Sequence, residues 1–170
     1  MHSYRIAVGS DDAAFEYRRA IVADLEKDER VVSVEDFGVH EDNLREFAYP
    51  EVAVAVAEAV AAGRADRGIL MCGTGIGVAI AANKVTGIRA TVAHDSYSVE
   101  RSIMSNDCQI LTMGQRVIGL EVARRLVREW LGYEFDPSSR SGAKVAIIEA
   151  YEKDHPTSLD TLKGMSCDID

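Results

Sequence analysis

Short apolar runs alternate with segments of helical periodicity along most of this 170-residue chain. The apolar runs have the length of strands, and most end at glycine or at polar turn residues. A strand, a helix and a second strand in succession form a right-handed crossover, and repeated crossovers build a parallel sheet. The sequence therefore predicts an α/β fold with a three-layer, Rossmann-like (flavodoxin-like) parallel sheet of about five strands and helices on both faces.

The elements can be placed by residue range. The predicted strands are residues 4–9, 31–37, 68–71, 88–93 and 108–113. The predicted helices are residues 13–25, 50–62, 75–83, 96–104, 120–130 and 143–151. Alternating valines after Pro50 would suit a strand, but proline in a first turn and the alanine-rich continuation favour a helix. In the first helix we expect Arg18, Arg19 and Asp24 to face away from the core.

Composition and charge narrow the class of protein. We interpret residues 1–152 as one domain and 153–170 as a C-terminal tail, flexible or packed on a neighbouring subunit. The net charge of −9 argues against nucleic acid as a partner, because binding a phosphate backbone needs a basic face. The apolar stretch 52–62 is too short to span a bilayer, and the first residues lack a signal-peptide pattern. We therefore expect a cytoplasmic protein with no membrane partner.

Polar residues of catalytic types follow several predicted strands. They are Ser10 and Asp11, Cys72 to Thr74, His94 and Asp95, and Gln115 and Arg116. In open parallel sheets, ligands bind outside the carboxyl ends of the strands. The sequence therefore predicts an active site at this edge. The three cysteines are widely spaced and fit neither a disulfide framework nor a zinc pattern, so we interpret them as reduced thiols and predict no metal site.

Cys72 and the turn after it are the strongest candidates for catalysis. A thiol near a helix N-terminus ionises more readily, so Cys72 could act as a base or nucleophile. A buried cysteine at a strand end is also a common small hydrophobe. The glycines of Gly73-Thr74-Gly75-Ile76-Gly77 let successive N–H groups point at one anion, or they simply permit a tight turn. Their spacing is neither a dinucleotide fingerprint nor a Walker loop.

Two other polar residues, Asp11 and His94, keep two interpretations each. Asp11 and Asp12 can cap the following helix, and Asp11 could instead accept a hydrogen bond from a substrate hydroxyl. His94 is either a structural group or an acid–base group.

Several motifs occur together in one known enzyme family. They are Gly9-Ser10-Asp11, Tyr49-Pro50, Cys72 to Gly77, Ala81-Ala82-Asn83-Lys84-Val85 with Gly87-Ile88-Arg89-Ala90, and Gly114-Gln115-Arg116-Val117-Ile118-Gly119. On these residues the chain, from Arg5 to Tyr151, resembles the type B ribose-5-phosphate isomerase and galactose-6-phosphate isomerase family. The resemblance implies an aldose–ketose isomerase that moves a proton between C1 and C2 of a sugar phosphate through a cis-enediolate, with no metal or organic cofactor.

The resemblance also implies residue roles. Cys72 would be the base, Thr74 would shuttle the hydroxyl proton, and amides of the glycine turn would stabilise the enediolate. The implied substrate-binding residues are Asp11, Asp12, Tyr49, Gly73, Gly75, Ile76, Gly77, Asn106, Arg116, Arg140 and Lys144. Because members of the family share their sites between subunits, we expect a homodimer or homotetramer. In it, Arg140 and Lys144 would hold phosphate in the neighbour's pocket.

Departures from the family pattern bear on the substrate. The family usually has histidine at the positions of Asp12 and Ser105, and its phosphate motif differs from Arg140-Ser141 with Lys144. The histidine at the Ser105 position opens the furanose ring, and serine cannot act as a base near neutral pH without an activator. Either the substrate is already open-chain, as a tetrulose phosphate must be, or His94 replaces the missing histidine as a third catalytic residue.

The sequence therefore leaves more than one substrate and function possible. The main expectation is isomerisation of ribose 5-phosphate and ribulose 5-phosphate, or of a related sugar phosphate. One alternative is an open-chain tetrose-phosphate isomerase that interconverts erythrulose 4-phosphate and erythrose 4-phosphate. Others are a non-catalytic sugar-phosphate sensor, and a subunit whose site needs a related chain.

Overall fold

A central parallel sheet organises the protein, whose computed structural model describes residues 3–39 and 47–155. The strands are β1 (Tyr4–Ser10), β2 (Val31–Asp36), β3 (Arg67–Cys72), β4 (Ala90–Val92) and β5 (Ile110–Gly114). The helices are α1 (Phe15–Leu25), α2 (Tyr49–Ala61), α3 (Ile76–Ala82), α4 (Ser96–Met104), α5 (Leu120–Trp130) and α6 (Gly142–Asp154). A 3-10 turn, η1 (Asp12–Ala14), precedes α1. The strand order is β2-β1-β3-β5-β4.

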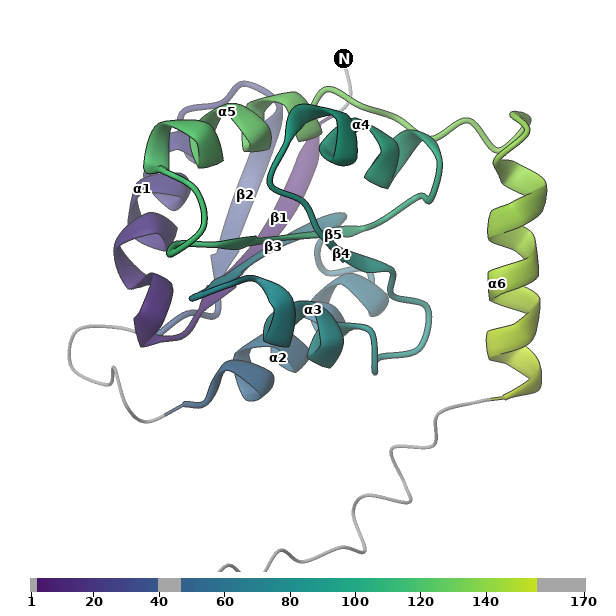
Figure 1. The fold of residues 1–170 in the computed structure, drawn as a ribbon, viewed down its shortest axis with the longest axis horizontal. Coiled ribbons are helices and arrows are strands. Elements are labelled where there is room, and N and C mark those ends of the chain that lie inside the picture. The colour runs from purple at the N-terminus through teal and green to yellow at the C-terminus, as the bar shows by residue number, and fades with distance from the viewer. Residues whose placement is uncertain (1–2, 40–46, 156–170) are drawn as a thin grey trace, which may run out of the picture.

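Helices cover both faces of the sheet, which confirms the predicted three-layer α/β fold (Figure 1). Helices α1, α4 and α5 cover one face, and α2 and α3 cover the other. Strand side chains alternate between two cores: Val8 packs with α1 and α5, whereas Ala7 packs with α2. The strand order departs from the flavodoxin order in its last two strands. Helix α3 leads to β4 at the sheet edge, and α4 returns β5 to the place beside β3.

Most predicted boundaries lie within a few residues of the observed ones, and those of α4 and α5 coincide with them. Strand β4 is shorter than predicted because Gly87 has a φ of +82° and the Arg89 N–H bonds to the Gln109 side chain instead of a neighbouring strand. Helix α6 runs beyond the predicted domain end to Asp154. Residues 156–170, most of the predicted tail, lie outside the described residues.

The expectation that Arg18 faces solvent is wrong. Its side chain is buried, forms an ion pair with Asp36 and donates to the Val39 carbonyl. A Cβ on Gly38 would lie 2.3 Å from the Arg18 side chain, so a larger residue there would displace the guanidinium. The carboxylate at the end of β2 thus draws an arginine of α1 inward, and this contact joins α1 to the carboxyl edge of the sheet.

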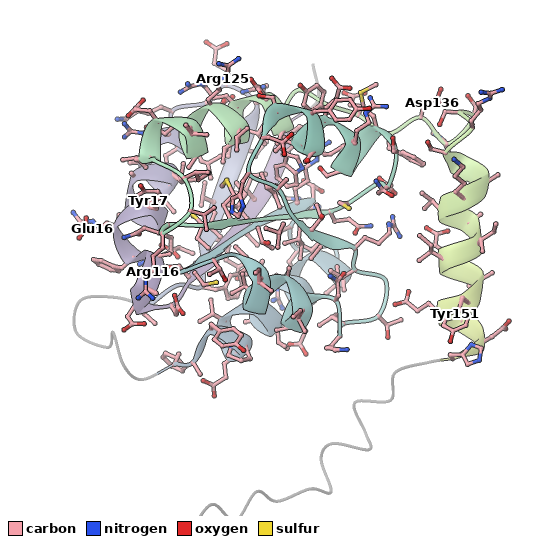
Figure 2. All side chains as sticks on the ribbon, in the orientation of Figure 1. Glu16, Tyr17, Arg116, Arg125, Asp136 and Tyr151 are labelled. Carbon is pink, nitrogen blue, oxygen red and sulfur yellow. The ribbon has the colours of Figure 1, made fainter. Side chains whose placement is uncertain are left out.

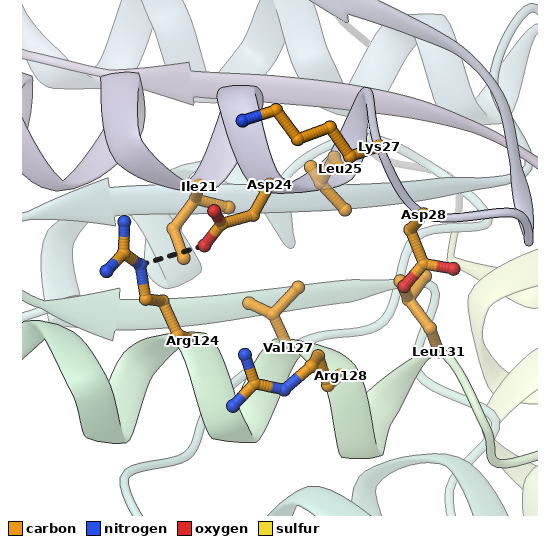
Figure 3. A pocket seen from close by; sticks show the side chains of 9 residues that line it. All are labelled: Ile21, Asp24, Leu25, Lys27, Asp28, Arg124, Val127, Arg128 and Leu131. Atoms are coloured by element: carbon orange, nitrogen blue, oxygen red, sulfur yellow. Dashed lines mark ion pairs between the residues drawn. The ribbon is translucent and has the colours of Figure 1, made fainter.

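Helices α1 and α5 pack side by side and leave a shallow groove between them (Figure 3). The groove encloses about 270 Å³ over the apolar side chains Ile21, Leu25, Val127 and Leu131. Asp24 of α1 and Arg124 of α5 form an ion pair of 2.8 Å across it. The residues predicted for catalysis and binding do not line this groove, so it is not the predicted site.

A second buried arginine joins the sheet to the end of α5. Arg67, the first residue of β3, donates to the carbonyls of Trp130 at 2.8 Å and Tyr133 at 2.6 Å. Its guanidinium also lies 4.2 Å from the centroid of the Tyr4 ring. Burial lowers the pKa of Arg67, although an arginine remains charged near neutral pH. Because Trp130 is the last residue of α5, the positive charge of Arg67 lies at the negative end of the helix dipole, which is a favourable interaction.

We expect Arg67→Met to lower the free energy of unfolding by about 2–4 kcal/mol, because it leaves two carbonyls without their donors. Urea unfolding followed by circular dichroism measures the change. Arg64→Met is the matched control, since Arg64 is exposed and lies three residues before Arg67, and it should change stability by no more than about 0.5 kcal/mol. Equal losses in the two variants would contradict the role given to Arg67.

Candidate active site

A cavity opens at the carboxyl edge of the sheet, where strand register brings three chain segments together. Ser10 of β1 pairs with Met71 of β3, and Cys72 of β3 pairs with Gly114 of β5. The segments that follow these strands therefore meet at one place. The cavity has a volume of about 430 Å³ and is lined by Asp11, Ala13, Tyr49, Cys72, Gly73, Thr74, Ile76, Gly77 and Arg116.

The Cys72 sulfur receives a backbone hydrogen bond at this edge. The Gly75 N–H donates to Cys72 Sγ at 3.1 Å, and the side chain is buried at the cavity wall. A donor that points at sulfur stabilises negative charge on it. Cys108 differs, because burial raises the pKa of its thiol to about 11, and Cys167 lies outside the described residues. Of the thiols among the described residues, Cys72 is thus the one that lines the cavity.

The turn after Cys72 lies directly on the backbone of β5. Gly75 is in the left-handed region with φ +80°, and a Cβ there would lie 2.9 Å from the Met113 carbonyl carbon. A Cβ on Gly114 would lie 2.6 Å from the backbone of Thr74. Neither position has room for a side chain, so the two glycines permit the close approach.

Thr74 and the amides of the turn are arranged differently from the prediction. Thr74 Oγ1 accepts a bond of 3.3 Å from the Ile76 N–H, which leaves the hydroxyl proton for another acceptor. The N–H groups of Gly75 and Ile76 thus donate to protein atoms. The prediction that these two amides bind substrate is therefore not supported by the hydrogen bonds, although Ile76 and Gly77 still line the cavity.

Tyr49 forms one wall of the cavity from the start of α2. Its ring packs so closely on α3 that a Cβ on Gly77 would lie 2.6 Å from the ring. The first turn of α2 is fixed by the bond from the Ala48 N–H to the Glu51 carboxylate at 2.8 Å. The hydroxyl-bearing ring is thus held beside the Cys72 turn by both helices.

Asp11 faces Arg116 across the cavity. Its carboxylate accepts a bond of 3.1 Å from the Ala13 N–H, so the capping interpretation is confirmed for Asp11. Burial and the charge of Asp12 raise the pKa of Asp11, and Arg116 opposes that rise. Asp12 itself is exposed and does not line the cavity.

Arg116 brings a positive charge to the cavity mouth (Figure 2). Its side chain lies over Gly73, where a Cβ would be 3.5 Å from Arg116 Cδ. The Arg116 N–H also donates to the Gly73 carbonyl at 3.0 Å. The guanidinium is exposed and can bind an anion with paired N–H donors.

His94 lies on the far side of β5 from Cys72 and does not line the cavity. Its Nε2 accepts a bond of 2.9 Å from the Gly114 N–H, which requires a neutral ring with the proton on Nδ1. Burial lowers the pKa of His94, and Asp95 opposes this shift. Because Nε2 is already an acceptor for the backbone, His94 is better placed to support the end of β5 than to open a sugar ring.

The remaining predicted residues lie at the opposite, amino-terminal edge of the sheet. Asn106 follows α4, and its side chain donates to the Arg101 carbonyl at 2.9 Å. Arg140 and Lys144 are exposed at the start of α6. Figures 1 and 2 show α6, with Tyr151, at the other end of the molecule from Arg116. One chain therefore does not bring these three residues to its own cavity.

Helix α6 is held at that edge by its acidic face. Glu149 forms an ion pair of 3.2 Å with Arg89, and Glu152 accepts a bond of 2.9 Å from the Gly87 N–H. Arg89 also binds Asp107 at 2.6 Å. Through Arg89, these contacts join the turn that carries Asn106 and Asp107 to the second half of α6.

Comparison with known proteins agrees with this geometry. Residues 6–148 match the family model described as ribose/galactose isomerase. The chain belongs to the ribose/galactose isomerase family. It is 61% identical over 150 residues to D-erythrulose-4-phosphate isomerase 2 of Mycolicibacterium smegmatis, which covers 87% of this chain and 97% of that protein. It is 44% identical to ribose-5-phosphate isomerase B of Escherichia coli over 88% of this chain and 97% of that protein.

Solved structures of the ribose/galactose isomerase family have the same fold. Ribose-5-phosphate isomerase B of Clostridium thermocellum matches with a TM-score of 0.81 and 43% identity over 89% of this chain and 99% of that one. The isomerase B of Mycoplasma genitalium with bound ribulose-5-phosphate matches with a TM-score of 0.81 and 27% identity over 90% of this chain and 99% of that one. The fold and the enzyme family predicted from the motifs are confirmed.

Two residues near the site, Ala13 and Thr112, escaped sequence analysis. Ala13 lines the cavity. Gln115, one of the predicted strand-end residues, accepts a bond of 3.3 Å from the Tyr17 N–H at the start of α1. Thr112 donates from its buried hydroxyl to the Gly75 carbonyl at 2.8 Å. The motif around Gly114 contained Gln115, but a threonine within a strand has no signal beyond ordinary β-propensity.

Neither a membrane-spanning helix nor a cluster of metal-ligand side chains occurs among the described residues. In residues 3–39 and 47–155, no helix combines the length and hydropathy that a bilayer crossing requires. In the same ranges, no group of three or more His, Cys, Asp or Glu side chains converges as a metal site would.

His94 gives a testable pH dependence of stability. Because its pKa is lower in the folded protein than in the unfolded chain, the unfolded chain binds the proton more readily. Its contribution to stability is therefore complete above the ordinary pKa of 6.5 and is lost as pH falls toward the lower folded value. We expect the urea midpoint of the wild type to fall between about pH 7 and 5, and to fall less in His94→Gln. Parallel curves for the two proteins would contradict this account.

Proposed function

We propose that this isomerase interconverts D-erythrulose 4-phosphate and D-erythrose 4-phosphate, with the sugar in its open-chain form. The observation that carries the reaction type is the buried Cys72 sulfur, which receives the Gly75 N–H and lies with Thr74 on the wall of one cavity. A base, a proton-carrying hydroxyl and a cation at the mouth are the groups that a 1,2-proton transfer on a sugar phosphate needs.

The proposed reaction begins with Cys72 as a thiolate. The sulfur takes a proton from C1 of the ketose, and the electron pair of that C–H bond forms a C1–C2 double bond while the C2 carbonyl becomes an enediolate oxygen. Thr74 passes a proton between the oxygens on C1 and C2. The thiol then returns its proton to C2, and the aldose forms with the carbonyl at C1. Protons and electrons balance without a redox partner.

The environment of Ser105 supports an open-chain substrate. Ser105 occupies the position where the family usually has its ring-opening histidine. Its hydroxyl accepts a bond of 3.4 Å from the Arg101 guanidinium, a donor that cannot take the serine proton. A tetrulose phosphate has no hydroxyl with which to close a furanose ring, so it needs no ring-opening base. The 61% identity to D-erythrulose-4-phosphate isomerase 2 supports the same substrate.

We also propose that two copies of the chain complete each site. Arg140, Lys144 and Asn106 have the chemistry of phosphate and hydroxyl binding, yet they lie at the amino edge of the sheet, away from Cys72. A symmetric dimer that places the amino edge of one copy over the cavity of the other would supply them in trans. Phosphate would then lie among Arg140 and Lys144 of one copy and Arg116 of the other. A reduced thiol at Cys72 fits the cytoplasmic location expected from the sequence.

Ribose 5-phosphate is the second candidate substrate. It is supported by the 44% identity to ribose-5-phosphate isomerase B of Escherichia coli. It would require another group to open the ring, and His94 is poorly placed for that because its Nε2 binds the Gly114 N–H.

A panel of four-, five- and six-carbon sugar phosphates tests the substrate. We expect kcat/KM for D-erythrulose 4-phosphate to exceed that for ribose 5-phosphate by at least about tenfold. Cys72→Ala should lower kcat by about 10²- to 10⁴-fold, whereas the matched control Cys108→Ala should keep most activity. Efficient turnover of ribose 5-phosphate would overturn the open-chain proposal. Failure of the wild type to exchange substrate hydrogen with D₂O would instead indicate a non-catalytic sensor.

Subunit mixing tests the shared site. Cys72→Ala and Arg140→Ala should each be nearly inactive alone, because every site lacks one essential group. When the two proteins are unfolded together and refolded, half of the dimers should be mixed and about a quarter of all sites should regain both groups. Recovery of activity toward that fraction supports the proposal. No recovery in mixtures that form heterodimers would contradict the shared site, because it is the result expected when each site takes Cys72 and Arg140 from the same chain.

A further inference from the structure

Both polar ends of Gly75 are used at the base of the Cys72 turn. Its N–H donates to Cys72 Sγ at 3.1 Å, and its carbonyl accepts from Thr112 Oγ1 at 2.8 Å. Both contacts are buried. The orientation of the amide that faces the sulfur therefore depends on how the Gly75 residue is held against β5.

Thr112 is placed for that task by strand geometry. On β5, Leu111 and Met113 pack in the core with α1 and α5, so Thr112 points to the opposite face, on which Ile110 packs and which α3 covers. The side chain is fully buried in that layer. A buried hydroxyl needs a partner, and the partner here is a carbonyl 37 residues earlier in the chain.

Glycine restrains its own backbone dihedrals less than any other residue, so the orientation of the turn depends on its contacts. Gly75 has a φ of +80° and a ψ of −12°, in a region that glycine enters and leaves easily. Its carbonyl accepts a second bond from the Ala79 N–H, but at 3.3 Å this is the longer of the two. The Thr112 hydroxyl thus supplies the shorter contact from the sheet to the carbonyl of a residue with little conformational restraint of its own.

We propose that Thr112 is a positioning residue for catalysis, which acts through Gly75 to keep a backbone N–H directed at the Cys72 sulfur. The proposal rests on the proposed role of Cys72 as the base. Loss of the hydroxyl releases the Gly75 carbonyl and allows φ and ψ of Gly75 to change. The preceding peptide, which carries the Gly75 N–H, can then turn away from the sulfur and stabilises negative charge there less well. Substrate contacts in the cavity stay in place, so the loss falls on kcat rather than on KM.

Thr112→Val tests the proposal because valine keeps the shape and removes only the hydroxyl. We expect kcat to fall about three- to tenfold with little change in KM, as is typical of one lost neutral hydrogen bond. The acid limb of the kcat–pH profile should move to higher pH, and so should the pH dependence of Cys72 alkylation by iodoacetamide. Thr91→Val, on the neighbouring strand β4, is the matched control and should leave both profiles unchanged.

Thr112→Ser separates positioning from packing. Serine restores the hydroxyl but loses a buried methyl group, whereas valine keeps the methyl groups but leaves the Gly75 carbonyl without this donor. Both variants should therefore unfold at lower temperature than the wild type, while only the pH profiles of serine return toward those of the wild type. A serine variant with pH profiles as displaced as those of valine would overturn the proposal. So would wild-type kcat and alkylation profiles in Thr112→Val. The alkylation profile needs no turnover, so it tests Thr112 even if the panel shows that Cys72 is not the base.

Discussion

The close contact between the turn after β3 and the backbone of β5 is the constraint on which the site depends. Cys72 pairs with Gly114 in the sheet, and the chain then folds back over Met113 and Gly114 with no side chain between the two backbones. The contact requires glycine on both sides, at Gly75 and Gly114. Because the turn cannot rise away from the sheet, the sulfur stays at the cavity wall and the Gly75 N–H reaches it.

The other cavity residues are arranged around that contact by elements on both faces. Tyr49 comes from α2 and packs on Gly77 of α3, while Asp11 follows β1 and caps the turn that leads to α1. Arg116 follows β5 and lies over Gly73. The site thus lies where β1, β3 and β5 end beside one another and their connections leave for opposite faces, which is where parallel sheets generally bind ligands.

The sequence predicted those parts of the structure that local pattern determines. Helical periodicity placed α4 and α5 at their observed bounds, and strand-end chemistry identified Cys72, Asp11 and Arg116 as neighbours. Contacts between segments far apart in sequence were not predictable in the same way. Arg18 reads as a surface residue of an amphipathic helix, yet Asp36 from the next strand draws it into the interior. In the sequence, Thr112 looks like an ordinary strand residue, because its hydrogen-bond partner Gly75 is 37 residues away and no local pattern connects the two.

The polar residues that the family pattern marks for the site are divided between two opposite edges of the sheet. At the carboxyl edge, the thiol of Cys72 and the hydroxyl of Thr74 line the cavity together with the cation Arg116. At the amino edge, Arg140 and Lys144 are exposed cations, and the Ser105 hydroxyl accepts a hydrogen bond from the Arg101 guanidinium. The carboxyl edge thus has the thiol and the hydroxyl, and the amino edge has two further cations. In the proposed dimer, a change at Ser105 would alter which sugar the site accepts and leave Cys72 and Thr74 in the cavity unchanged, so the same thiol could serve a cyclic or an open-chain phosphate.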